Sequence, residues 1–278
     1  MLQAVTDSRP TPAHAYQEYF GPAIFEPLVA KVLECAVPAP GDRVLDVACG
    51  TGIVTRRVAA LAGRSGRVVG VDINPGMLEV ARSVPTLNEA RIDWLAGDGT
   101  ALDLPDEALD LVYCQQGLQF FPDWAAGAGE MRRVLRDGGR AVIATWQGPD
   151  RHPLYAALAD AEEPHLGALG VEISRQELEA PFLLGSAEEL ERILRGAGFT
   201  DIRIVERSID ARFATADRFV ERMEFAYAAV IPQFAEDPAA FEAYLAAVAR
   251  ETTEIVERYR DGDHIVVPMH ANIAIAVR

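Results

Sequence analysis

The chain has 278 residues, half of them hydrophobic, which is enough for one sizeable core or for one core with an added cap. Its formal net charge of −16 disfavours nucleic acids and anionic membrane surfaces as partners, because both are bound through clusters of Lys and Arg. Three cysteines without C-x-x-C spacing, no signal-peptide pattern and no apolar run of membrane-spanning length together indicate a cytoplasmic protein without a disulfide framework.

The N-terminal part of the chain is predicted to be helical. Residues 14–37 read as helix, with Tyr16 and Tyr19 near its start, and "PAPGD" at 38–42 is a turn. We therefore expect a helical lid over residues 1–37.

Strands and helices then alternate as far as Trp146, which predicts a core domain over residues 38–146. Strands are expected at 43–48, 67–72, within 90–98, at 108–115 and at 138–146, and helices at 52–61, 75–84 and 123–135. This alternation is typical of a mostly parallel sheet covered by helices on both faces.

The pattern changes after Trp146. Residues 147–185 are mixed and interrupted by Gly and Pro, which indicates a lid insertion. Residues 186–278 are expected to complete the sheet, with a helical insertion at about 211–262. Within this part we predict a helix at 186–199, a strand at 200–207, mainly helix at 215–260, and a final strand or strand pair at 264–278.

The stretch "VLDVACGTG" runs from a hydrophobic strand into a glycine turn with one acid, Asp46. Gly50 and Gly52 let the backbone approach a ligand closely. A dinucleotide fingerprint would need Gly in place of Thr55, and Asp46 would repel a pyrophosphate. A ligand with an ammonium or sulfonium group fits better, which points to S-adenosylmethionine; the alternative is that Asp46 only caps the turn.

"VLDVACGTG" closely resembles motif I of the class I S-adenosylmethionine-dependent methyltransferases. Ala48 replaces the first Gly of the motif, as in the group that includes quinone-biosynthesis C-methyltransferases, and further motifs follow in register over residues 43–146. The resemblance implies a doubly wound, seven-stranded, mostly parallel α/β sheet of the Rossmann-like methyltransferase fold. It also implies an antiparallel last strand and helical lid insertions.

The cofactor contacts are expected at the strand ends. Asp72 lies 20 residues beyond Gly52, where an acid can bind both ribose hydroxyls. Asp72 could also be the N-cap of the next helix, and the two roles do not exclude each other. By resemblance, Ile73 and Met77 flank the adenine, and the carboxylate of Asp98 and the N–H of Gly99 meet its edge. The Asp98–Gly99 pair could also be only a turn. The predicted cofactor-binding residues are Tyr19, Asp46, Ala48, Gly50, Thr51, Gly52, Asp72, Ile73, Met77, Asp98, Gly99 and Gln115.

Methyl transfer is an in-line displacement at an already activated carbon, so that the enzyme contributes mostly by positioning. The candidates for catalysis are His152 as a base and Tyr16. Both residues have a structural alternative, since a lone His is more often a structural residue and aromatic residues more often belong to the hydrophobic core. The predicted substrate-binding residues are Gln116, Gln119, Phe120, Trp146 and Tyr155, and no metal ligands are predicted.

The sequence lacks the N/D-P-P-Y/F tetrapeptide, the Pro-Cys nucleophile and the metal-ligand spacing of other methyltransferase subclasses. We therefore expect methyl transfer to O, N, C or S of a small organic acceptor, with S-adenosylhomocysteine as product, by a monomer or homodimer. Two alternatives stay open: an S-adenosylmethionine-binding protein that is regulatory or without catalysis, and an NAD(P)-dependent oxidoreductase.

Overall fold

The computed structural model describes residues 11–86, 90–228 and 237–278. The first ten residues of the predicted lid at 1–37 lie outside the described residues, as do residues 229–236 of the predicted insertion at about 211–262.

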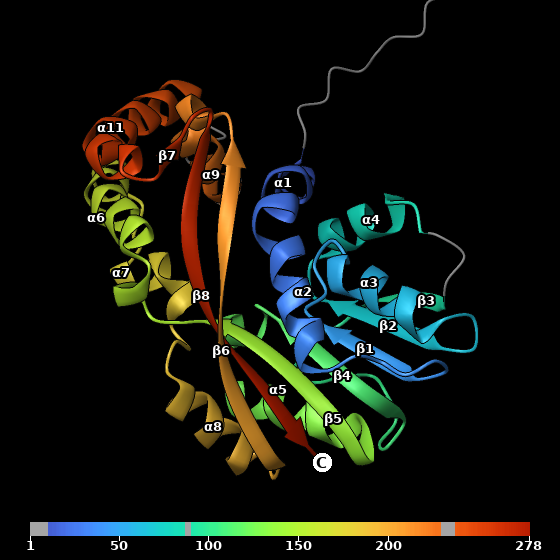
Figure 1. The fold of residues 1–278 in the computed structure, drawn as a ribbon. Helices are drawn as coiled ribbons and strands as arrows, with labels where there is room; N and C mark the ends of the chain where they lie inside the picture. Colours follow the sequence, from blue (N-terminus) through green and yellow to red (C-terminus); the bar gives the residue numbers. More distant parts are fainter. Residues whose placement is uncertain (1–10, 87–89, 229–236) are drawn as a thin grey trace, which may run out of the picture.

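A single mixed sheet organises the described part of the chain (Figure 1). Its strand order is β3-β2-β1-β4-β5-β8-β6, and β1 to β5 are parallel while β8 is antiparallel to both of its main neighbours. This confirms the predicted Rossmann-like sheet with an antiparallel last strand. The strands are β1 (Arg43–Val47), β2 (Arg67–Asp72), β3 (Arg91–Ala96), β4 (Leu109–Gln115), β5 (Leu135–Trp146), β6 (Thr200–Ala214), β7 (Arg260–Asp261) and β8 (His264–Val277).

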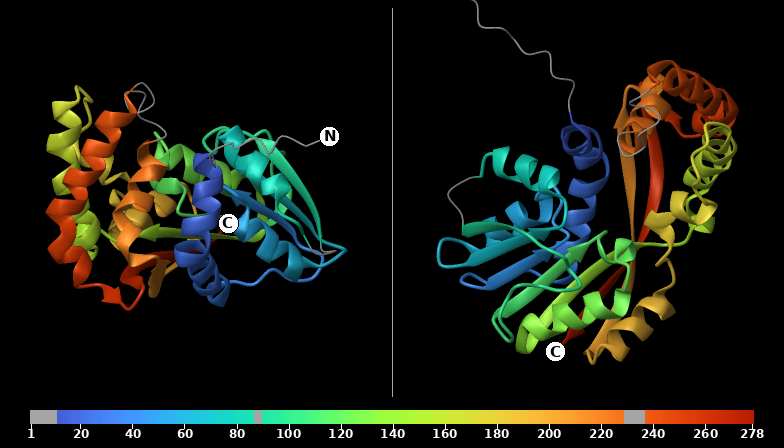
Figure 2. Two further views of the ribbon diagram at one scale, coloured as in Figure 1. Left: turned by 90° about the horizontal axis from the view of Figure 1, so that it is seen from above. Right: turned by 180° about the vertical axis from the view of Figure 1, so that it is seen from behind.

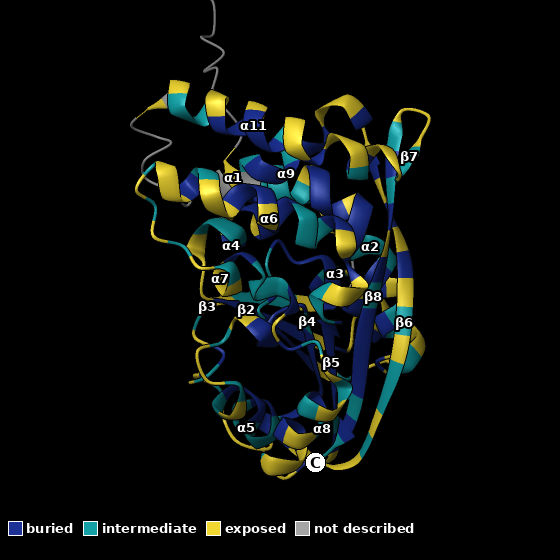
Figure 3. Ribbon diagram, turned by 90° about the vertical axis from the view of Figure 1, so that its left-hand side faces the viewer, coloured by how far each residue is buried: buried dark blue, intermediate teal, exposed yellow. Residues whose placement is uncertain are grey.

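Alternate strand residues face two separate hydrophobic cores, because successive side chains of a strand point to opposite faces. Val44 and Val68 pack with residues of α2 and α3 on one face, and Leu45 and Val69 pack with residues of α5 and α8 on the other. Figure 3 shows the inner strands buried beneath helices whose outer faces are exposed, whereas the edge strand β6 is largely exposed. The covering helices are α2 (Glu26–Cys35), α3 (Ile53–Ala62), α4 (Pro75–Ser83), α5 (Trp124–Val134) and α8 (Ala187–Gly196).

Strands β6 and β8 form an arm that extends beyond the rest of the sheet (Figures 1 and 2). β8 pairs with β5 only over Ala271–Val277, but it pairs with β6 along its whole length. The predicted insertion at about 211–262 therefore begins too early: buried Ala211 and Phe213 still alternate as strand residues. The helices packed at the end of the arm are α6 (Pro153–Ala168), α9 (Phe219–Ala228) and α11 (Pro238–Glu257), with the short α7 (Arg175–Leu178) next to α6.

The N-terminal segment lies between this arm and the parallel part of the sheet (Figure 1). It consists of α1 (Pro12–Ala15), a π-helical segment η1 (Tyr16–Phe25) and α2, so the predicted helix at 14–37 ends at Cys35. The segment contacts β6, α4 and α9. None of the helices in the described ranges has the length and apolar character of a membrane span.

Two carboxyl groups are buried together where α6 meets α9. Glu162 and Glu224 are 6% and 1% exposed, and the hydroxyl of Tyr244 donates a 2.7 Å hydrogen bond to Glu224 Oε2. Burial raises the pKa of both carboxyl groups. A carboxyl whose folded pKa is raised holds its proton in the folded state, so the free energy of unfolding falls as the pH rises above the ordinary carboxyl range.

We therefore expect Glu224→Gln to raise the unfolding temperature by roughly 2–4 °C at about pH 8, the shift that about 1 kcal/mol produces in a chain of this size, and to change it little at about pH 5. Thermal unfolding followed by circular dichroism at the two pH values measures this difference. The exposed Glu242→Gln on α11 is the matched control. A Glu224→Gln variant with the wild-type pH profile would show that the pair carries no such cost.

Candidate active site

The glycine turn after β1 adopts the left-handed backbone at Ala48, Gly50 and Gly52, with φ of 55°, 55° and 81°. A Cβ added at Gly52 would lie 2.2 Å from Cη2 of Trp94, whereas a Cβ at Gly50 would meet nothing within 4 Å. Gly52 is therefore required by close packing, and Gly50 leaves room for a ligand against the backbone. The amides at the start of α3 lie at the same place.

Asp46 is buried at the end of β1, and the hydroxyl of Thr55 donates a 2.6 Å hydrogen bond to its Oδ2. Burial raises the pKa of Asp46 to about 7, the Thr55 hydrogen bonds oppose this, and the charge of Asp72 adds to it. Asp46 thus joins the strand to the first turn of α3. With a pKa of about 7, Asp46 is partly ionised at neutral pH, and a cation bound at this edge of the sheet would favour its negatively charged form.

Asp72 at the end of β2 holds two backbone segments. Its Oδ2 accepts from the N–H of Gly50 at 2.7 Å, and its Oδ1 accepts from the N–H of Asn74 at 2.8 Å. The possibility that Asp72 is the N-cap of α4 is wrong, because Asn74 takes that role and accepts from the amides of Gly76 and Met77. Each carboxylate oxygen of Asp72 retains capacity for a further donor.

Two polar atoms beside the turn have no partner among the described residues: the buried hydroxyl oxygen of Thr51 and the side-chain Oε1 of Gln115. Buried polar atoms are normally hydrogen-bonded, so these atoms fit a polar ligand bound here. With the open approach at Gly50 and the acids Asp46 and Asp72, the site has the donor and acceptor set that S-adenosylmethionine requires.

The residues predicted for the adenine lie at the edge of the same site. Ile73 is 73% exposed and Met77 is half-buried, so that both offer apolar surface. Asp98 is exposed, and its Oδ1 accepts from the N–H and hydroxyl of Thr100 at 2.8 and 2.7 Å. The Asp98–Gly99 turn therefore exists, and it leaves Oδ2 of Asp98 for a ligand.

Tyr19 is the predicted cofactor residue that comes from the N-terminal segment. Its ring packs against Phe20 and Phe213, and the guanidinium of Arg222 lies 5.1 Å from the ring centroid. Tyr16 and Tyr19 lie on the same segment η1, and Tyr16 lines the cavity described next, whereas Tyr19 does not. The hydroxyl of Tyr19 is buried and has no hydrogen-bond partner among the described residues, so that cofactor contact by Tyr19 stays a prediction.

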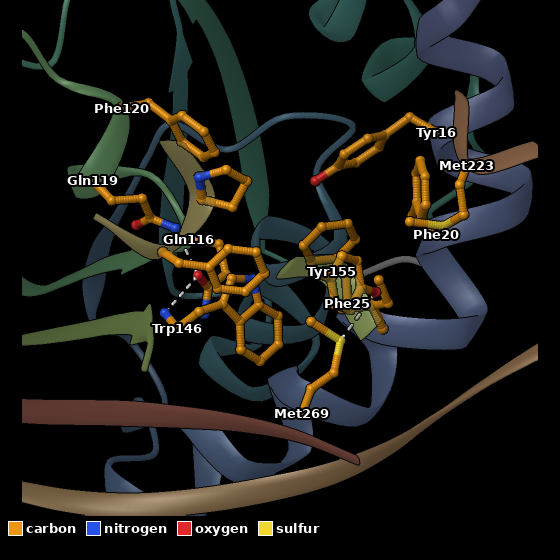
Figure 4. Close-up of a pocket in the computed structure, with 13 residues that line it drawn as sticks. Tyr16, Phe20, Phe25, Gln116, Gln119, Phe120, Trp146, Tyr155, Met223 and Met269 are labelled. Carbon is orange, nitrogen blue, oxygen red and sulfur yellow. Dashed lines mark hydrogen bonds between the residues drawn. The ribbon is translucent and has the colours of Figure 1, made fainter. Parts of the chain in front are cut away.

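A cavity of about 230 Å³ lies between the N-terminal segment and the loop after β4 (Figure 4). This loop packs on the glycine turn, since a Cβ added at Gly117 would lie 2.5 Å from Cβ of Ala48. All five predicted substrate-binding residues line the cavity, and Phe120, 56% exposed, lies on the loop after β4. The lining residues are Tyr16, Phe20, Ile24, Phe25, Gln116, Gln119, Phe120, Trp146, Tyr155, Pro181, Phe182, Met223 and Met269.

Tyr16 connects the two halves of the site. It lines the cavity, and burial together with the charge of Asp72 raises the pKa of its hydroxyl above the ordinary value. Figure 4 shows this hydroxyl pointing away from η1 toward the middle of the group of labelled residues. Tyr16 therefore keeps its proton at neutral pH and can donate a hydrogen bond between the two subsites.

The geometry opposes the prediction that His152 is a base. Its ring is buried, its Nε2 accepts a 3.0 Å hydrogen bond from the N–H of His270, and its Nδ1 lies 3.1 Å from the carbonyl oxygen of Gly148. Because a backbone N–H can only donate, Nε2 carries no proton and Nδ1–H donates to Gly148. Burial lowers the pKa of His152 to about 4. Its lone pair is occupied, and the ring packs 4.7 Å from that of Phe182, so His152 supports the cavity wall.

The sequence did not reveal seven of the lining residues. Phe20, Ile24 and Phe25 had an available signal, because they lie on the same N-terminal segment as Tyr16. The other four come from segments far apart in the chain and carry no motif: Pro181, Phe182, Met223 and Met269.

A doubly wound sheet, a glycine turn between two acids and an adjoining cavity for a second small molecule define a class I S-adenosylmethionine-dependent methyltransferase. The chain belongs to this family, and residues 44–139 match the family model described as "Methyltransferase domain". It is a small-molecule methyltransferase that uses S-adenosylmethionine and releases S-adenosylhomocysteine.

The similar proteins agree with this assignment. Demethylmenaquinone methyltransferase of Staphylococcus aureus is 32% identical over 171 residues, which cover 59% of this chain and 70% of that protein. Two solved structures share the fold at low identity. YcgJ of Bacillus subtilis has a TM-score of 0.57 at 17% identity, covering 90% of this chain and 97% of its own. Phosphoethanolamine N-methyltransferase 2 of Haemonchus contortus has a TM-score of 0.57 at 19% identity, covering 96% of this chain and 56% of its own.

Proposed function

We propose that the chain methylates a neutral, largely apolar molecule with a flat ring, held in the cavity beside the glycine turn. The observation that carries this proposal is the character of the cavity wall. Its thirteen lining residues are aromatic, aliphatic, proline or methionine side chains with two glutamines, and none bears a formal charge. A charged acceptor would lose hydration there, and no lining residue would offer it an opposite formal charge.

On the cofactor side we propose that Asp72 binds the ribose and that Asp46 faces the cationic end. The glycine turn supports the amino-acid part, together with Ala48, Thr51 and Gln115. Bound S-adenosylmethionine supplies a methyl carbon activated by a positive sulfur. Tyr16 lies between the subsites as a hydrogen-bond donor and positions the reacting groups, which is the main contribution that an in-line displacement needs.

Of the described residues in the cavity wall, none is suited to remove a proton at neutral pH. The pKa of Tyr16 is raised, and the lone pair of His152 is occupied by the N–H of His270. This favours an acceptor atom that is nucleophilic without a strong base, such as an electron-rich ring carbon or an acidic enol or phenol. The name of the Staphylococcus aureus relative, demethylmenaquinone methyltransferase, points to an acceptor of this kind.

The same proposal includes a cytoplasmic location and a monomer or homodimer without a nucleic-acid or membrane partner. The net charge of −16 supports this, as do Cys35, Cys49 and Cys114, which are all free thiols. Among the described residues, no group of three His, Cys, Asp or Glu side chains could hold a metal ion.

A methyl-transfer assay with isotope-labelled S-adenosylmethionine tests the acceptor class. We expect turnover with 1,4-dihydroxynaphthalene and none with the charged amines histamine and phosphoethanolamine. Trp146→Ala should reduce turnover at least tenfold with unchanged affinity for S-adenosylhomocysteine, because about 1.4 kcal/mol of lost ring contact is a factor of ten. Turnover confined to the amines would contradict the acceptor class. Tight cofactor binding without turnover across neutral and charged acceptors would favour a regulatory binding protein.

A further inference from the structure

Two glutamines on the loop after β4, Gln116 and Gln119, supply the amide groups among the residues described as lining the cavity. Gln116 has a left-handed backbone with φ of 56°, which is uncommon for a residue with a side chain. Its N–H donates to the carbonyl of Ala144 at 2.8 Å, so the strained residue is fixed to β5. Strain of this kind is retained where the surrounding structure holds a functional side chain in place.

The hydrogen bonds of the pair define which atom of each amide is which. Oε1 of Gln116 accepts from the N–H of Trp146 at 3.1 Å, and a backbone N–H can only donate. The amide orientation of Gln116 is therefore fixed. Nε2 of Gln119 lies 2.7 Å from the same Oε1, so Gln119 is also oriented, with its nitrogen toward Gln116.

One donor and one acceptor are left over. Nε2 of Gln116 and Oε1 of Gln119 are buried and have no hydrogen-bond partner within the described part of the chain. Both side chains line the cavity, and the two residues are 8% and 3% exposed. An unpaired buried polar group carries a substantial desolvation cost, and two of them beside a largely apolar cavity point to a ligand that satisfies both.

We propose that Gln116 and Gln119 form a specificity pair that recognises an acceptor presenting a carbonyl beside a hydroxyl or an N–H. The carbonyl accepts from Nε2 of Gln116, and the adjacent O–H or N–H donates to Oε1 of Gln119. Conjugated keto-enols, hydroxylated quinoid rings and cyclic amides have this arrangement. The inference rests on the proposed function, because it assigns the acceptor of that same site.

Three flat bicyclic molecules test the two hydrogen bonds one at a time. 2-Quinolone has a carbonyl beside an N–H, N-methyl-2-quinolone keeps only the carbonyl, and quinoline has neither group. Dissociation constants are measured by calorimetry on the wild-type protein saturated with S-adenosylhomocysteine. We expect 2-quinolone to bind at least tenfold more tightly than N-methyl-2-quinolone, since loss of the donor leaves Oε1 of Gln119 unpaired.

Gln119→Met removes the amide at similar volume and should abolish this preference. Gln176→Met makes the same exchange at an exposed position of α7 outside the cavity, so it is the matched control and should keep the preference. Gln116 has a strained backbone and supports Trp146, so a substitution there would disturb more than the hydrogen bond. Its role is therefore tested in the wild-type protein by NMR: the side-chain amide signals of Gln116 should shift when 2-quinolone is added and should not shift with quinoline.

Equal affinities of 2-quinolone and N-methyl-2-quinolone, including failure of both to bind, would overturn the inference. So would a preference that survives in Gln119→Met. The proposed function is judged separately by the methyl-transfer assay. A protein that methylates 1,4-dihydroxynaphthalene but does not distinguish the quinolones refutes only the glutamine pair.

Discussion

Asp72→Ala is expected to weaken the binding of S-adenosylhomocysteine by at least an order of magnitude. Charge-assisted hydrogen bonds are worth roughly 1.5–3 kcal/mol each, and the proposed ribose contact makes up to two of them. The substitution also frees the N–H groups of Gly50 and Asn74, which Asp72 holds at 2.7 and 2.8 Å. Calorimetric titration of the wild-type and variant proteins measures the combined loss.

The ribose contact and the loop support can be separated with altered ligands. Removing a ribose hydroxyl should cost the wild-type protein affinity, but it should cost Asp72→Ala nothing, because the partner of the hydroxyl is already gone. Adenosine, 2′-deoxyadenosine and 3′-deoxyadenosine therefore form a double-mutant cycle with the variant. Loop support alone would lower the affinity for all three nucleosides by the same factor.

The exposed Glu79→Ala on α4 removes a carboxylate from the neighbouring helix and should leave every affinity unchanged. If Asp72→Ala discriminated against the deoxynucleosides as strongly as the wild-type protein does, Asp72 would be a structural residue of the turn and would not be the ribose acceptor.

The parallel half of the sheet could be predicted closely because its signals are local. The strand at 67–72 has the predicted bounds, since Val68, Val69 and Val71 form a buried run between turns. Pro75 marks the start of α4, and Asp46 with Gly50 and Gly52 marks the motif at the end of β1. Each of these features depends on a few consecutive residues, which a sequence displays directly.

The arm and the acceptor cavity could not be predicted in the same way. The extension of β6 to Ala214 depends on pairing with His264 at the start of β8, fifty residues further along the chain. Met223 and Met269 meet Trp146 in one cavity only because the arm carries α9 over the end of β5. Such contacts are set by tertiary packing, and no local pattern reports them.

His152 shows a second limit, which is chemical. A lone histidine after a strand is a reasonable candidate for a base from sequence alone. Its role changes once its neighbours are known, because the N–H of His270, 118 residues away in the chain, occupies the lone pair that a base would need. The identity of a side chain predicts what it can do, and its hydrogen-bond partners decide what it does.

The binding of S-adenosylmethionine is expected to depend on the charge state of Asp46. Since the pKa of Asp46 is raised to about 7, its carboxyl is mainly neutral below that pH and mainly negative above it. The negative form favours a cation, so the affinity should increase as the pH rises. If only the carboxylate form binds tightly, the dissociation constant falls about tenfold between about pH 6 and about pH 8.

Two variants and one ligand distinguish Asp46 from other titrating groups. Asp46→Asn should bind S-adenosylmethionine weakly at both pH values and lose this pH dependence, whereas neutral adenosine should bind the wild-type protein equally at both. Thr55→Val keeps the side-chain volume but removes the hydrogen bond that lowers the pKa of Asp46. The midpoint of its affinity profile should therefore move to higher pH. If Asp46→Asn retained the wild-type profile, the cation would be held by another group, and Asp46 would serve only to tie β1 to α3.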